Sequence, residues 1–236
     1  MTATNSSETG RSQRTALAVL GVVAAIAVGF GLGFFANQFL HDDRPADPVA
    51  GSVDVGFAQD MMVHHNQAVE MSAIAIANAT DPMVRDLAYD ILTTQQNQIG
   101  QMTGWLSLWD QPLLSTEDYM TWMADGHDGM AHDGAAHGSA ATTAPTAAGT
   151  QMPGMATSED MAALRQARGP EADVLFLQLM LRHHQGGLPM MEYGAQRAEV
   201  PTVRGLAQTM VDTQQSESDR MTQLLAEKGA APLPMN

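Results

Sequence analysis

The sequence predicts an all-α protein, namely an antiparallel four-helix bundle that follows an N-terminal transmembrane helix. Residues 15–36 are apolar and uncharged, and residues 54–106 recur without a gap as residues 173–225. Within each copy, apolar residues return at the spacing of an amphipathic helix. Helices with one apolar stripe each bury those stripes by packing together, which is the arrangement of a four-helix bundle.

The apolar segment has the length of a membrane span. The 21 residues from 15 to 35 carry no charge, and such a helix extends about 31 Å, as far as the hydrocarbon core is thick. A cleaved signal peptide is the alternative, but its apolar region usually covers only about 7–15 residues. Two arginines precede the segment and two aspartates follow it, which places residues 1–14 in the cytoplasm and the C-terminal part outside. We therefore predict a single-pass protein of the cell membrane.

The repeat divides the rest of the chain. At an offset of 119 residues, 20 of 53 aligned positions are identical, which indicates an internal duplication. Asp54 and Asp173 are predicted as N-caps of the first helix of each copy, and Pro82 and Pro201 as the first residues of the second. The predicted helices cover 54–79, 83–109, 173–198 and 202–228. The predicted divisions are a linker at 37–52, a first hairpin at 53–109, a connector at 110–172, a second hairpin at 173–229 and a tail at 230–236.

The composition excludes several classes of function. The chain has 26 acidic and 11 basic residues and a net charge of −15, and such a surface would repel a nucleic acid. Cysteine is absent, which excludes disulfides, thiolate metal sites and cysteine nucleophiles. Methionine is abundant, with 18 residues, and its thioether serves either as a flexible core filler or as a soft metal ligand.

Methionine and histidine recur together on the first helix of each hairpin. Met61 lies three and four residues before His64 and His65, so these side chains are neighbours on a helix, and Met71 lies two turns beyond His64. Thioether and imidazole groups directed at one point suit copper, with Cu(I) favoured and zinc less so. The other interpretation is that the methionines fill the core and the histidines belong to a buried polar network. The predicted ligands are Met61, His64, His65, Met71, Met180, His183, His184 and Met190, and the polar residues predicted to support them are Gln95, Gln98, Gln214 and Glu217.

The connector contains a second group of methionines and histidines. Between residues 120 and 161 the chain is otherwise mostly Gly, Ala, Asp, Ser and Thr, a composition that does not form a core. Its methionines therefore have little packing reason to be present, and a tract rich in Met and His suits the capture of a soft metal ion. Drift in a linker rich in Ala and Gly is the alternative. The predicted connector ligands are Met120, Met123, His127, Met130, His132, His137, Met152 and Met155.

Two stretches resemble the signature of the bacterial domain of unknown function 305 family, DVGFAQDMMVHHNQAVEMS (54–72) and DVLFLQLMLRHHQGGLPMM (173–191). The segment MPGMATSEDMAAL (152–164) and the two TQQ triplets are similar too, so the resemblance covers about residues 52–228. It implies an exported protein with a ferritin-like four-helix bundle, in a family of which some members bind copper. Its metal candidates fall on the same eight Met and His residues. Gln98 and Pro189 depart from the family pattern, so the two hairpins need not bind equally.

These observations predict a membrane-anchored, extracytoplasmic protein that binds copper and either buffers it or hands it on, without catalytic turnover. The alternative is a non-catalytic scaffold or accessory subunit that docks on a membrane complex, with structural His pairs. A cuprous oxidase is a third and weaker hypothesis. The predicted partners are a metal ion and the membrane, and the sequence leaves open a homo-oligomer or a partner in a membrane complex.

Overall fold

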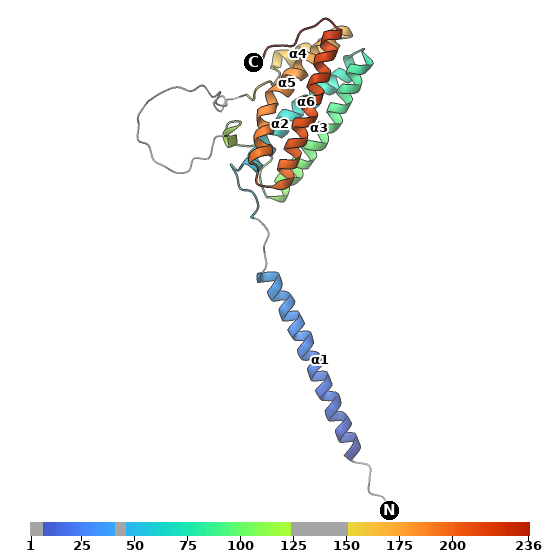
Figure 1. Ribbon diagram of the computed structural model, residues 1–236, viewed down its shortest axis with the longest axis vertical. Helices are drawn as coiled ribbons and strands as arrows, with labels where there is room; N and C mark the ends of the chain where they lie inside the picture. Colours follow the sequence, from blue (N-terminus) through green and yellow to red (C-terminus); the bar gives the residue numbers. More distant parts are fainter. Residues whose placement is uncertain (1–6, 41–45, 124–150) are drawn as a thin grey trace, which may run out of the picture. The chain divides into compact units, whose positions relative to one another are not determined.

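The computed structural model describes residues 7–40, 46–123 and 151–236, and these ranges form six α-helices and one 3-10 helix without a strand. The chain divides into two units, Met1–Ala46 and Asp47–Asn236, which are described separately. The elements are α1 (Ser7–Leu40), α2 (Val53–Asn78), α3 (Pro82–Leu108), η1 (Thr121–Met123), α4 (Ser158–Gln166), α5 (Pro170–Arg197) and α6 (Pro201–Glu227) (Figure 1). The four long helices of the second unit begin and end within three residues of the predicted ones.

The first unit contains the apolar helix α1. Its segment Ala16–Ala36 has a mean hydropathy of 2.4 over 21 residues, and none of it is buried. By length and composition this helix is able to cross a membrane.

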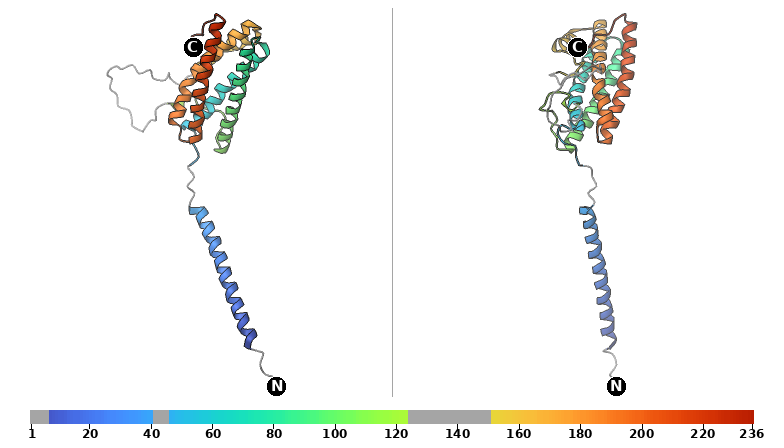
Figure 2. Two further views of the ribbon diagram at one scale, coloured as in Figure 1. Left: turned by 45° about the vertical axis from the view of Figure 1, so that its right-hand side comes forward. Right: turned by 60° about the vertical axis from the view of Figure 1, so that its left-hand side comes forward.

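The second unit is an antiparallel four-helix bundle made of two hairpins, as predicted. The four long helices α2, α3, α5 and α6 run side by side in both views of Figure 2. Helix α2 packs along both α3 and α5, whereas α3 and α6 barely touch, so the α2–α5 pair forms the central seam. Phe57 of α2 lies against Gly194 of α5, and His64 lies against Gly187. The first helices of the two repeats therefore run antiparallel and are related by an approximate twofold axis.

The prediction that Asp54 and Asp173 are N-caps is wrong. Ser52 caps α2 with its side chain, and Gly169 occupies the N-cap position of α5 without a side-chain bond. The two aspartates instead reach across to the turn of the opposite hairpin. Asp54 accepts hydrogen bonds from the backbone N–H groups of Glu199 and Val200, both at 2.9 Å.

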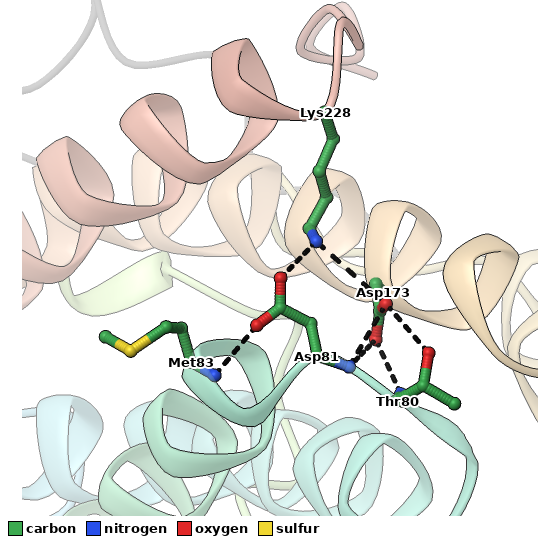
Figure 3. Close-up of polar contacts among 5 residues, drawn as sticks. All are labelled: Thr80, Asp81, Met83, Asp173 and Lys228. Atoms are coloured by element: carbon green, nitrogen blue, oxygen red, sulfur yellow. Dashed lines mark hydrogen bonds and ion pairs between the residues drawn. The ribbon is translucent and has the colours of Figure 1, made fainter.

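Asp173 makes the equivalent contact with the other turn (Figure 3). It accepts from the backbone N–H groups of Thr80 at 2.9 Å and Asp81 at 3.2 Å. Lys228, the only lysine of the chain, forms an ion pair with Asp81, and its Nζ lies 3.9 Å from a carboxylate oxygen of Asp173. The sequence identity of positions 54 and 173 thus reflects one contact, made twice, that fastens each hairpin to the other.

Part of the connector also packs against the bundle, contrary to the prediction that its methionines have no packing role. Met123 and Met152 are 6% and 2% exposed, and Met161 of α4 is 5% exposed. The η1 turn is held by Asp60, which accepts from the Met120 N–H at 2.7 Å and from the Trp122 indole at 2.8 Å. Helix α4, which was not predicted, begins with a capping box of Thr157 and Asp160. These segments cover α2, which is why its first ten residues are almost entirely buried.

We predict that Asp54→Ala destabilises the bundle by about 3 kcal/mol, because two backbone N–H groups of the opposite turn lose a charged acceptor. The free energy of unfolding, measured by urea denaturation followed by circular dichroism, checks this. Asp90→Ala is the matched control, since Asp90 is exposed on α3 and its carboxylate caps no turn. Equal stability of the two variants would contradict the prediction.

Candidate metal centre

A polar layer crosses the middle of the bundle and separates two apolar clusters. The cluster on one side contains Phe57, Met102 and Val203, and that on the other contains Phe176, Ile91 and Leu224. Between them, each of the four long helices contributes two polar residues three or fewer positions apart. We call this set the histidine layer; its members are His64 and His65 of α2, Gln95 and Gln98 of α3, His183 and His184 of α5, and Gln214 and Glu217 of α6.

The outer histidines of the layer are held by the second helix of their own hairpin. The His65 Nε2 lies 2.7 Å from the Gln98 Oε1, and the His184 Nε2 lies 2.7 Å from a Glu217 carboxylate oxygen. The two contacts are equivalent in the repeat, so the change from glutamine to glutamate alters the charge and keeps the geometry. Gln98 and Glu217 therefore support the histidines as predicted from the sequence.

The inner histidines meet at the seam between the hairpins. The rings of His64 and His183 are 3.7 Å apart between centroids and inclined by 33°. The His183 Nε2 lies 3.1 Å from the backbone carbonyl oxygen of His64 and donates to it. Gly187 makes room for this stack, because a Cβ atom there would lie 2.7 Å from the His64 Cε1.

The layer contains many buried polar atoms that have no hydrogen-bond partner among the described residues. They include the Nδ1 of all four histidines, the Nε2 of His64, and both amide atoms of Gln95 and Gln214. The four histidines are at most 1% exposed. Each buried polar group without a partner costs about 1–3 kcal/mol. Of the five unpartnered ring nitrogens, two belong to His64, and a neutral imidazole has one lone-pair nitrogen, so each of the four rings could offer one nitrogen to a metal ion.

The surroundings keep the rings of His64, His65 and His183 neutral. Burial lowers the pKa of His64 and His183 well below its ordinary value, and charge repulsion from neighbouring histidines lowers it further. Burial also lowers the pKa of His65 to about 4, although the hydrogen bond that its ring donates to the Gln98 Oε1 opposes the shift. Neutral imidazole is the form that binds metals. These three histidines are thus ready to act as ligands at neutral pH without first releasing a proton.

The four predicted methionine ligands of α2 and α5 do not lie together repeat by repeat, as the sequence suggested. Met61 of the first repeat lies in one apolar cluster with Met190 of the second, and Met71 lies in the other cluster with Met180. All four are at most 1% exposed. Each side of the histidine layer is therefore flanked by one methionine from each hairpin, because α2 and α5 are antiparallel.

Histidines and carboxylates alone do not make a complete site. Among residues 46–123 and 151–236, no three His, Asp or Glu side chains converge on a point that would hold a metal ion. A metal in the layer would need a ligand of another kind, such as a methionine sulfur, or a rotation of a ring.

The connector residues predicted as ligands fall into two groups. Met120, Met123, Met152 and Met155 are described and pack against the apolar cluster that contains Met61. His127, Met130, His132 and His137 lie outside the described residues. Pro153 was not predicted; its carbonyl lies beside the His64 ring and partly opposes the lowering of that pKa, although no hydrogen bond with good geometry forms.

Known proteins share this architecture. Residues 54–225 match the family described as Domain of unknown function (DUF305). The crystal structure of a putative secreted DUF305 protein from Streptomyces coelicolor is 43% identical with a TM-score of 0.66, and the match covers 79% of this chain and 99% of that chain. A DUF305 fragment from Deinococcus radiodurans is 30% identical with a TM-score of 0.56, over 78% of this chain and 99% of that chain.

Two more distant matches are a solved structure, which agrees on the fold alone, and a short sequence match. CopM in the Cu(I)-bound form is 22% identical with a TM-score of 0.52, over 74% of this chain and 96% of that chain. An uncharacterised protein of Acanthamoeba polyphaga mimivirus is 37% identical over 49 residues, which are 21% of this chain. That match spans about a third of the viral protein, 32% of its length.

We predict that the metal-free protein loses stability as the pH falls from 6.5 towards 4. His65 titrates at its ordinary value of 6.5 when unfolded and at about 4 when folded, so the unfolded state binds more protons between these values. The contribution is present in full above pH 6.5 and decreases by about 3 kcal/mol at pH 4 for His65 alone.

The replacement His65→Gln, which keeps a partner for Gln98 and does not titrate, should make this decrease shallower. Urea denaturation at several pH values between 6.5 and 5, with a chelator present, measures the slope. Identical slopes for the two proteins would contradict the shifted titration of His65.

Proposed function

The chain belongs to the DUF305 family, and from the histidine layer we propose that it is a copper-binding protein of the extracytoplasmic side, anchored in the membrane by α1. In the proposal it holds copper, preferably as Cu(I), to buffer it or pass it on, without catalytic turnover. The observation that carries the proposal is the set of five ring nitrogens without a hydrogen-bond partner on four histidines that are at most 1% exposed. A structure without a ligand for them would leave several kcal/mol of desolvation uncompensated.

The ligand chemistry around the layer supports copper. Methionines from both hairpins flank the histidines on both sides, and thioether sulfur with imidazole nitrogen is a donor set that favours Cu(I). CopM, whose structures include Cu(I)-bound and Cu(II)-bound forms, has the same fold. For the membrane anchor, support comes from the length and hydropathy of Ala16–Ala36 and from the Streptomyces coelicolor relative, described as a putative secreted protein.

We predict that the full-length protein in detergent competes with a chromophoric Cu(I) chelator, and that His64→Asn with His183→Asn weakens its affinity by about 100-fold or more, which is about 2.7 kcal/mol. The comparison protein has residues 124–150 replaced by a Gly/Ser segment of equal length, which removes the connector histidines and leaves the packed methionines in place. This second protein should bind as the wild type does.

Three outcomes would contradict the assignment to the histidine layer. Binding lost only with the Gly/Ser segment would place the site in the connector. No Cu(I) binding by the wild type would favour the scaffold hypothesis. Unfolding of the double variant in metal-free buffer, seen as loss of helical circular dichroism, would give the histidines a structural role instead.

We predict that the protein remains in the membrane fraction after carbonate extraction and that protease added to intact spheroplasts digests the bundle. Replacing residues 15–36 with the cleavable signal peptide of a secreted protein should release the bundle in soluble form. Release of the unaltered protein by carbonate, or an N-terminus that begins after residue 36, would show a cleaved signal peptide instead of an anchor.

A further inference from the structure

A short segment between η1 and α4 lies across the seam of the bundle beside the histidine layer. We call residues 152–157 the strap. It touches α5 backbone to backbone, because a Cβ atom on Gly154 would lie 2.4 Å from the Arg182 carbonyl oxygen and one on Gly186 would lie 2.3 Å from that of Pro153. On α2, the Gln67 side chain grips the strap at Ala156, donating to its carbonyl at 2.9 Å and accepting from its N–H at 2.6 Å.

The positions that hold the strap are those at which the two repeats differ. Gln67 and Gly186 are equivalent in the duplication, so one copy binds the strap and the other makes room for it. Glu70, which is replaced by Pro189 in the second copy, pairs with Arg165 of α4. A single segment that crosses a twofold axis meets two equivalent positions from different sides, and one residue type cannot serve both.

The strap carries a buried thioether next to the residue that lies beside His64. Met152 is 2% exposed and belongs to the same apolar cluster as Met61 and Met190, the methionines on one side of the layer. The next residue, Pro153, places its carbonyl beside the ring of His64. His64 is the one histidine of the layer with both ring nitrogens free among the described residues. Met152 is therefore one residue away from the carbonyl that lies beside His64, the histidine with the most unpartnered ring atoms.

We propose that the strap completes the metal site, with the Met152 sulfur as a ligand on the His64 side of the layer. This inference rests on the proposed function, and it joins the connector and the bundle into one site. It also supplies the ligand that is missing from the His, Asp and Glu side chains of the described residues.

The direct test uses full-length protein in detergent, labelled with [methyl-13C]methionine and titrated with Ag(I), a diamagnetic ion of the same charge as Cu(I). The Met152 methyl signal, identified by its absence from a Met152→Leu spectrum, should shift as Ag(I) binds. In Cu(I) competition, Met152→Leu should weaken affinity by about tenfold or more. Met83→Leu is its control, because Met83 is 46% exposed on α3.

A second variant tests the strap by displacing it. Gly186→Ala places a methyl group against the Pro153 carbonyl and should likewise lower the Cu(I) affinity. Gly205→Ala is the matched control, since a Cβ atom there meets nothing within 4 Å and the substitution carries the same gain in helix propensity. It should bind as the wild type does.

An unmoved Met152 signal, together with wild-type affinity in Met152→Leu, would overturn the strap proposal. If the double variant of His64 and His183 still lost binding, the copper function would stand without the strap. If the wild type bound neither Ag(I) nor Cu(I), the result would contradict both the copper-binding function and the role of Met152.

Discussion

Four imidazoles buried between two apolar clusters constrain the whole bundle. Protonating any of them would place a charge in a region of low polarity, and the inner pair, with rings 3.7 Å apart, would repel strongly if both were charged. The fold therefore keeps His64, His65 and His183 neutral and orients the outer pair through Gln98 and Glu217. The same neutrality leaves lone pairs exposed to the interior. A bundle selected for stability alone would fill these positions with apolar residues, since a buried polar layer with free atoms is less stable than a packed core.

The duplication explains both the regularity and the exceptions of the structure. Contacts that obey the twofold axis are kept in both copies, as with Asp54 and Asp173, each of which binds the turn of the other hairpin. Contacts with the single connector cannot obey the axis. Position 67 therefore carries an amide that binds the strap, whereas its equivalent, position 186, is a glycine that allows backbone contact. At positions 67 and 186 the difference between the repeats thus coincides with contact to a segment that is present only once.

The sequence was sufficient to predict the four long helices of the bundle and the apolar helix α1, because these follow from spacing along one chain; the eight Met and His ligands stay a prediction. It did not predict the role of Asp54, since a side chain that caps a turn about 145 residues away looks the same as a local N-cap. Nor did it group Met61 with Met190, which depends on the antiparallel packing of α2 and α5. The average composition of the connector is that of a linker, so it gives no sign of the short segments around Met123 and Met152 that pack in the core. The signal that could have revealed the strap was the loss of identity at Gln67 and Gly186.

The charge of the layer bears on the choice of ion under the proposed function. Glu217 is the one carboxylate among its eight members, and its side chain is 13% exposed, while burial lowers the pKa of His64, His65 and His183 and keeps these three rings neutral at pH 7. The cost of moving an ion from water into an apolar interior rises with the square of its charge. Imidazole nitrogen suits copper in either oxidation state, whereas thioether sulfur favours the monovalent soft ion. Under the proposed function, an ion of one charge would cost less to bury than a divalent ion and would gain sulfur coordination from the flanking methionines. The carboxylate of Glu217 would then offset the charge of one Cu(I), an electrostatic role that Gln98, its neutral counterpart in the first repeat, does not have.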